Sequence, residues 1–139
     1  MLIRGVPLMI FAFAVYNIIA FLMPGFSWMA ELLRFRMMSG GEWGMSGGDF
    51  MVAGSILILL FELVRSARIN QRTIVEHILA LVLFVGMLVE FLMVPETATA
   101  TFFLLLVISF VDVVGGFAIG MRAGQRSISL ESTENVNTR

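Results

Sequence analysis

Four long apolar runs occupy most of this chain and constrain its fold more than any other feature. They cover approximately residues 6–23, 50–66, 74–94 and 98–121. A helix needs roughly 20 mostly apolar residues to cross a bilayer, and within lipid it satisfies its backbone hydrogen bonds inside its own segment. The runs therefore predict an all-α fold, an integral membrane four-helix bundle, in a transmembrane domain over residues 1–124.

The composition supports a membrane protein and excludes several kinds of site. Hydrophobic residues make up 59% of the chain and charged residues 14%, against about 45–50% and about 25% in soluble domains. A net charge of −1 gives no electrostatic basis for binding nucleic acid. Cysteine is absent and there is one histidine, so we expect no metal site, no cofactor and no cysteine nucleophile.

The connection between the first two runs has two distinct parts. Residues 27–38, SWMAELLRFRMM, mix aromatic and leucine side chains with charges, which predicts a short interfacial helix in this first outer loop. Residues 39–49, SGGEWGMSGGD, are rich in glycine, which favours turns and close backbone approach. They form either a flexible turn with Trp43 anchored at the membrane surface or a loop that covers a pore or binds a partner. Asp49 is expected to cap the second span.

Arginine positions predict the orientation of the chain. With four spans, one side of the membrane receives more arginines, namely Arg4, Arg65, Arg68, Arg72, Arg122 and Arg126. The other side receives Arg34 and Arg36. The positive-inside rule therefore places both termini in the cytoplasm of a multi-pass protein. The polar segment 125–139 is too poor in apolar residues to fold alone and is expected to be a disordered cytoplasmic tail.

Asp112 is the carboxylate placed deepest in a predicted span. It lies nine residues before Met121, or roughly 13 Å into a hydrocarbon core about 30 Å thick. A charged group there is costly, so Asp112 must face the bundle interior. Gly116 and Gly120 follow it at four-residue spacing on the same helix stripe. Their G-x-x-x-G pattern predicts a helix-packing face.

The other polar residues of the spans suggest two polar layers. Glu62, His77 and Asp112 are expected to form an intramembrane layer in the inner half of the bundle, and Asn17 and Glu90 a second layer in the outer half. The inner layer could fix helix register, relay protons or bind a cation. Glu76 and Glu62 also have simpler interpretations. Thr73 and Glu76 fit a capping box, and Arg65 follows Glu62 at the three-residue spacing of a helical ion pair near the cytoplasmic surface.

Several segments together resemble a known group of proteins. These are EWGMSGGD, FELVRSAR, VEHILALVLFVGMLVEFLMVP and TATFFLLLVISFVDVVGGF, within residues 40–120. They are similar to a family of small uncharacterised four-span proteobacterial inner-membrane proteins. The resemblance implies a bacterial inner-membrane location and this topology, but no chemistry.

These features predict a function of interaction rather than catalysis. No serine or threonine lies in the sequence context of a hydrolase nucleophile, so the chain is not expected to be an enzyme. The expected function is an accessory or scaffolding subunit of an inner-membrane assembly, with the lipid bilayer, other membrane proteins or further copies of itself in a homo-oligomer as partners. The alternative is a small proton-coupled carrier or channel in which Asp112 titrates.

Overall fold

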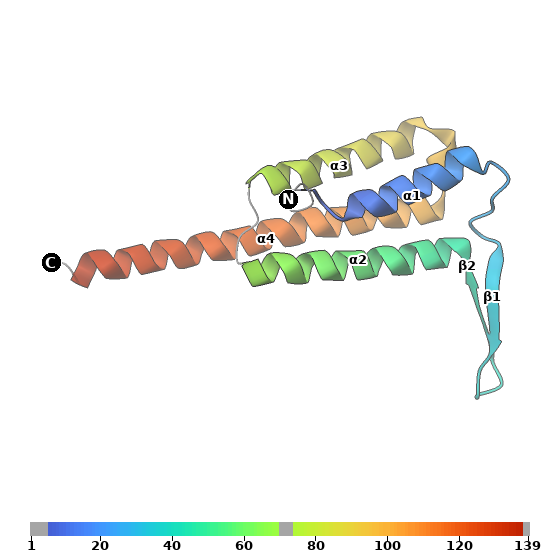
Figure 1. The fold of residues 1–139 in the computed structure, drawn as a ribbon, viewed down its shortest axis with the longest axis horizontal. Coiled ribbons are helices and arrows are strands. Elements are labelled where there is room, and N and C mark those ends of the chain that lie inside the picture. Colours follow the sequence, from blue (N-terminus) through green and yellow to red (C-terminus); the bar gives the residue numbers. More distant parts are fainter. Residues whose placement is uncertain (1–5, 70–73, 138–139) are drawn as a thin grey trace.

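The computed structural model describes residues 6–69 and 74–137, and these form four α-helices and one β-hairpin (Figure 1). In chain order the elements are α1 (Met9–Leu22), β1 (Glu31–Arg36), β2 (Glu42–Ser46), α2 (Gly47–Ile69), α3 (Ile74–Met93), a short 3-10 helix, η2 (Pro95–Thr97), and α4 (Ala100–Asn137). The predicted helical bundle is therefore present, but the fold is not purely α-helical.

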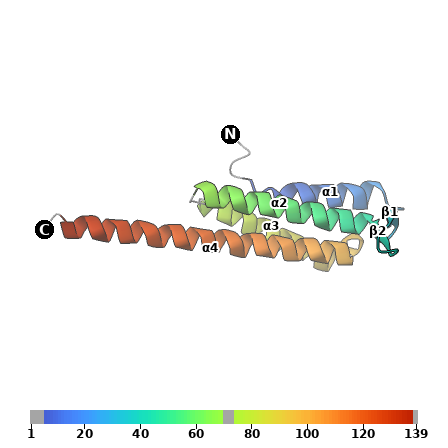
Figure 2. The ribbon, with the colours of Figure 1, turned by 90° about the horizontal axis from the view of Figure 1, so that it is seen from below.

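Helix α4 is the central element of the bundle. It packs against α2 on one side and α3 on the other, and α1 lies mainly on α2 with fewer contacts to α4. Helices α2 and α4 run in one direction, and α1 and α3 run in the opposite direction (Figures 1 and 2). The hairpin lies at the end of the bundle where α2 and α4 begin, called here the hairpin end.

Three described helices are long and apolar enough to cross a membrane, which indicates a membrane protein. They are Gly47–Ala67, Ile74–Met93 and Ala100–Met121, close to the three later spans predicted from the sequence. Helix α1 has only 14 residues, about 21 Å at 1.5 Å per residue, against a hydrocarbon core of about 30 Å. It covers part of the first predicted span, 6–23, and begins part-way along α2 (Figures 1 and 2).

The predicted interfacial helix is wrong, because its residues form the first strand of an antiparallel hairpin. Strand β1 pairs with β2 in a register that places Phe35 opposite Trp43 and Arg34 opposite Gly44. Leucine and phenylalanine alternate with arginine along Leu33–Arg36, a two-residue period that suits a strand. Gly40 adopts a positive φ of 87° in the connecting turn, where glycine avoids strain.

The predicted disordered tail also differs from the structure. Helix α4 continues to Asn137 and extends well past the other helices (Figures 1 and 2), so the prediction for 125–139 is wrong over 125–137, and residues 138–139 lie outside the described residues. Nucleation is the costly step in helix formation and propagation is cheap. The membrane helix supplies the nucleus, and no proline interrupts the segment that follows.

An aromatic cluster joins the elements at the hairpin end. The Tyr16 ring stacks on Trp28 with centroids 4.5 Å apart and meets Phe102 edge-on at 5.0 Å. The Tyr16 hydroxyl and the Thr99 Oγ1 lie 2.6 Å apart in a hydrogen bond. Tyr16 and Phe102 are fully buried. The cluster therefore fixes the middle of α1, the linker before β1 and the start of α4 relative to one another.

Candidate functional site

Buried polar side chains lie along α2 and α4 in the interior of the bundle. They follow helical spacing and are Ser55, Glu62 and Ser66 on α2 and Ser109 and Asp112 on α4. Glu62 is 0% exposed and Asp112 is 1% exposed. Ionisable groups inside membrane segments are costly and are usually tied to function or to specific packing. The structure thus places the Asp112 side chain in the bundle interior, as its position in the sequence predicts.

Glu62 receives the amino end of α1. The backbone N–H of Leu8 donates a hydrogen bond of 3.2 Å to Glu62 Oε2, and Leu8 is the residue that precedes α1. The first turn of a helix has N–H groups without intrahelical acceptors and carries a partial positive charge. Glu62 lies within the candidate span Gly47–Ala67. The amino end of α1 is therefore hydrogen-bonded to a carboxyl group inside the bundle.

Glu62 and Asp112 lie at nearly the same level of the bundle. A Cβ on Gly115 of α4 would lie 2.9 Å from Cδ2 of Leu63 on α2, so these two residues are in register. The two helices run in the same direction, so Glu62 is level with a point about two residues beyond Asp112, or roughly 3 Å along the axis. Two buried carboxylates therefore occupy one level on adjacent helices.

His77 lies farther from this level than the sequence suggests. A Cβ on Gly120 would lie 3.0 Å from the His77 Nε2, and the His77 ring meets Phe117 edge-on at 6.4 Å. Gly120 is eight residues beyond Asp112, or about 12 Å along α4. The structure thus brings Glu62 and Asp112 to one level and places His77 toward the opposite end. The described residues contain no group of three or more His, Cys, Asp or Glu that could hold a metal ion.

The glycines of α4 contact two different helices. Gly120 lies against His77 of α3, whereas Gly115, which is not part of the G-x-x-x-G pattern, lies against Leu63 of α2. Gly116 is buried. Small residues on two faces let α4 approach both neighbours closely. The capping role predicted for Glu76 requires Thr73, which lies outside the described residues.

Asn17 and Glu90 meet across α1 and α3, near the hairpin end. The Asn17 Nδ2 donates to Glu90 Oε2 at 3.4 Å and to the Phe13 carbonyl at 3.0 Å. The first bond is long and therefore weak. Asn17 Oδ1 is buried and has no hydrogen-bond partner in the described part of the chain. The structure thus brings these two side chains together through a weak bond.

A capping box begins α2 and connects it to the hairpin. The N–H and Oγ of Ser46 each donate to Asp49 Oδ2 at 2.9 Å, and the Asp49 N–H donates to the Ser46 Oγ at 3.2 Å. Ser46 is therefore the cap, and the prediction that Asp49 caps this helix is wrong. Asp49 sits at the third helical position and completes the box, a pattern visible in the spacing Ser46-Gly-Gly-Asp49.

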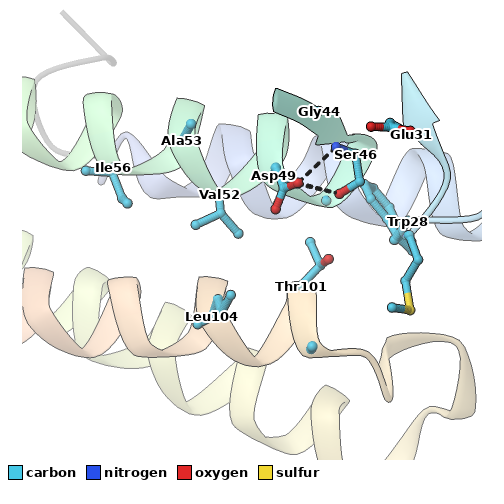
Figure 3. A pocket seen from close by; sticks show the side chains of 13 residues that line it. Trp28, Glu31, Gly44, Ser46, Asp49, Val52, Ala53, Ile56, Thr101 and Leu104 are labelled. Atoms are coloured by element: carbon cyan, nitrogen blue, oxygen red, sulfur yellow. Dashed lines mark hydrogen bonds between the residues drawn. The ribbon is translucent and has the colours of Figure 1, made fainter. Parts of the chain in front are cut away.

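An open groove of about 670 Å³ lies beneath the hairpin, between the first turns of α2 and α4 (Figure 3). Its walls come from the linker before β1, from both strands and from both helices, and include Trp28, Glu31, Gly44, Ser46, Asp49, Val52, Ala53, Ile56, Thr101 and Leu104. The sequence pattern does not reveal this groove, because it depends on where the hairpin lies over the two helices. The pattern of 39–49 indicates only a turn or a covering loop, whereas residues 42–46 form a strand and residues 47–49 the first turn of α2.

The hairpin carries apolar and charged side chains on opposite faces. The Phe35 and Trp43 rings stack with centroids 6.3 Å apart. On the other face Arg34 forms ion pairs with Glu31 at 2.7 Å and Glu42 at 3.5 Å. The hydrogen bonds from Arg34 to Glu31 raise the pKa of the guanidinium, which stays charged throughout the physiological range.

Comparison with known proteins supplies no relative: no family model matches the chain, and no curated protein or solved structure matches it significantly. Function is therefore inferred from the residues and geometry of the chain itself.

Proposed function

We propose that this protein is an accessory or scaffolding subunit of an assembly in a bacterial inner membrane. Its partner is another membrane protein or a further copy of the chain. In this proposal α1 is a fourth, shortened membrane helix, and both termini are cytoplasmic, as the arginine distribution favours. The three long apolar helices support a place in a membrane, and the bacterial inner membrane is part of the proposal.

The observation that carries this proposal is the exposed hairpin. It projects crosswise from the bundle and past α2 (Figure 1), and Phe35 and Trp43 remain 55% and 44% exposed. An isolated two-stranded hairpin is marginally stable in water at best, and it gains stability by packing against another element. Within the described residues, no other element packs on the outer part of this hairpin. A neighbouring protein surface would supply that packing.

The lipid-facing surface of the helices offers further places for a partner helix. A Cβ on Gly54 of α2 or Gly86 of α3 would have no atom within 4 Å, so both positions are open notches. Shallow apolar cavities of about 160 Å³ and 350 Å³ line the seam between α1 and α2. Small residues and grooves of this kind let a second transmembrane helix approach closely.

The proposal is tested by placing a photo-reactive amino acid at Phe35 and irradiating native membranes. We expect a discrete protein adduct whose partner mass spectrometry identifies, because the hairpin packs on that partner. The matched control is the same residue at Phe61, an exposed aromatic of α2 distant from the hairpin, which should not form that adduct. If Phe35 yields lipid adducts alone, the hairpin lies on the bilayer and the docking proposal is wrong.

The second candidate function, a proton-coupled carrier or channel, has one specific observation in its favour. Glu62 and Asp112 are both buried at one level of the membrane segments, and a helix end points at Glu62. Carriers often place helix ends and carboxylates together near the middle of the membrane.

Asp112→Asn separates the two functions. Asparagine preserves the size of the side chain and one acceptor oxygen but cannot titrate. For an accessory subunit we expect unchanged assembly and no change in proton flux across liposomes holding the protein. Glu96→Gln, at an exposed carboxylate, is the matched control. A wild-type flux that Asp112→Asn abolishes and Glu96→Gln preserves would establish the carrier instead.

A further inference from the structure

The groove beneath the hairpin has an apolar half inside the membrane. Its deeper walls are Val52, Ala53 and Ile56 of α2 and Leu104 of α4. All four belong to candidate membrane spans, and all but Val52 are exposed at the protein surface. This half of the groove therefore opens sideways toward the hydrocarbon and can receive a lipid acyl chain. Its volume of about 670 Å³ falls within the range of small-molecule binding sites, about 300–1,000 Å³.

The other half of the groove is polar and carries a net negative charge. Glu31 and Asp49 both line it, together with Ser46 and Thr101 (Figure 3). Glu31 is paired with Arg34, whereas Asp49 has no ion pair in the described part of the chain. Both hydrogen bonds from Ser46 go to Asp49 Oδ2, so Oδ1 of Asp49 remains available to a donor. The mouth is therefore suited to a cationic hydrogen-bond donor.

We propose that this groove binds a phospholipid with a primary-amine headgroup, that is, a phosphatidylethanolamine. The ammonium group donates to Asp49, and one acyl chain lies along Ala53, Ile56 and Leu104. The two halves of the groove match the headgroup and the acyl chain of a lipid in the bilayer. Asp49 is in the first turn of α2, where its span begins, and the apolar walls from α2 lie further along the same span. An anionic phospholipid without an amine would meet like charge at the mouth.

Trp28 lines the groove and provides a direct probe. The chain has two tryptophans, so in Trp43→Phe the fluorescence comes from Trp28 alone. This variant is reconstituted into bilayers that contain phospholipids with brominated acyl chains, which quench nearby tryptophan. At equal mole fraction we expect phosphatidylethanolamine to occupy the site about two- to five-fold more strongly than phosphatidylglycerol, as for a rim-exposed ion pair. Phosphatidylcholine, which lacks N–H donors, should fall between them.

Two further substitutions and one control distinguish this site from ordinary contact with bulk lipid. Asp49→Asn retains an acceptor for Ser46 but loses the charge, and should abolish the preference, whereas Glu96→Gln at the same end of the bundle should preserve it. Ala53→Phe fills the apolar half and should reduce Trp28 quenching by every phospholipid. Equal quenching by the three headgroups, or a preference that survives Asp49→Asn, would overturn the proposal. If Asp49→Asn does not fold, the headgroup comparison and Ala53→Phe decide it. The outcome is independent of whether Phe35 contacts a protein partner.

Discussion

Replacing Gly48 with alanine is expected to destabilise the protein by about 1–3 kcal/mol, as overpacking of a tight contact does. Gly48 is buried where three segments meet. A Cβ there would lie 3.0 Å from the Trp28 carbonyl oxygen and would overlap the Thr101 Oγ1. The Thr101 side chain can rotate away, but the carbonyl is backbone and accepts the Gly48 N–H at 2.8 Å. The added methyl group therefore strains the bond that holds the linker to α2.

Gly54→Ala is the matched control in the same helix. A Cβ on Gly54 would have no atom within 4 Å, so alanine meets no obstacle and gains helix propensity, worth up to about 1 kcal/mol. The two substitutions should thus shift the unfolding free energy in opposite directions, measured by thermal or denaturant unfolding in detergent. Equal shifts of the same sign would show that the approach at Gly48 is looser than the structure indicates.

The membrane helices are predictable from the sequence because their signal is local. The length of each apolar run and the residues that end it, such as Pro95 after α3, are visible without any tertiary information. The apolar run overestimates the length of α1, although Pro7 indicates a later start. Proline lacks an N–H and disfavours helical geometry in the residue before it, and α1 begins two residues after it.

The hairpin is harder to predict because the residues of its first strand fit both the spacing of an amphipathic helix and the alternation of a strand. Its leucines, aromatic residues and charges fit an interfacial helix, whereas the alternation of Leu33, Arg34, Phe35 and Arg36 fits a strand. The glycine-rich turn that follows and the strand-like EWGMS beyond it are the deciding signals, since a strand needs a partner and a helix does not. Pairing of two segments is a non-local property and is less visible in a single pattern.

The candidate site is predictable in part for the same physical reason. Depth within a helix can be counted from its ends, so the sequence assigns Asn17 and Glu90 to one layer, and the structure places them in contact. The alignment of one helix against another cannot be counted in this way. The contact of Gly115 with Leu63 brings Glu62 level with Asp112. The contact of Gly120 with His77 places His77 farther along α4.

The second large effect is expected at Glu62, where Glu62→Leu should be less stable than Glu62→Gln by about 1–3 kcal/mol. Both substitutions remove the ionisable group, so the comparison between them tests the hydrogen-bond acceptor. Glutamine retains an oxygen for the Leu8 N–H, now bonded to Glu62 at 3.2 Å. Leucine removes the acceptor of this partly buried N–H, and an unsatisfied buried donor costs about 1–3 kcal/mol.

The structural consequence of Glu62→Leu is local, and a single cysteine can detect it. The chain contains no cysteine, so Val6→Cys provides a unique thiol beside the amino end of α1. In the Glu62→Leu background this thiol should react faster with a water-soluble maleimide than in the Glu62→Gln background, because the first turn of α1 detaches from α2. The helix end is positively polarised, so Glu62→Gln itself should be slightly less stable than the wild type. If Glu62→Leu is as stable as Glu62→Gln and no more reactive, the Leu8 bond does not hold α1 in place, and packing by buried Met9 and Tyr16 does so instead.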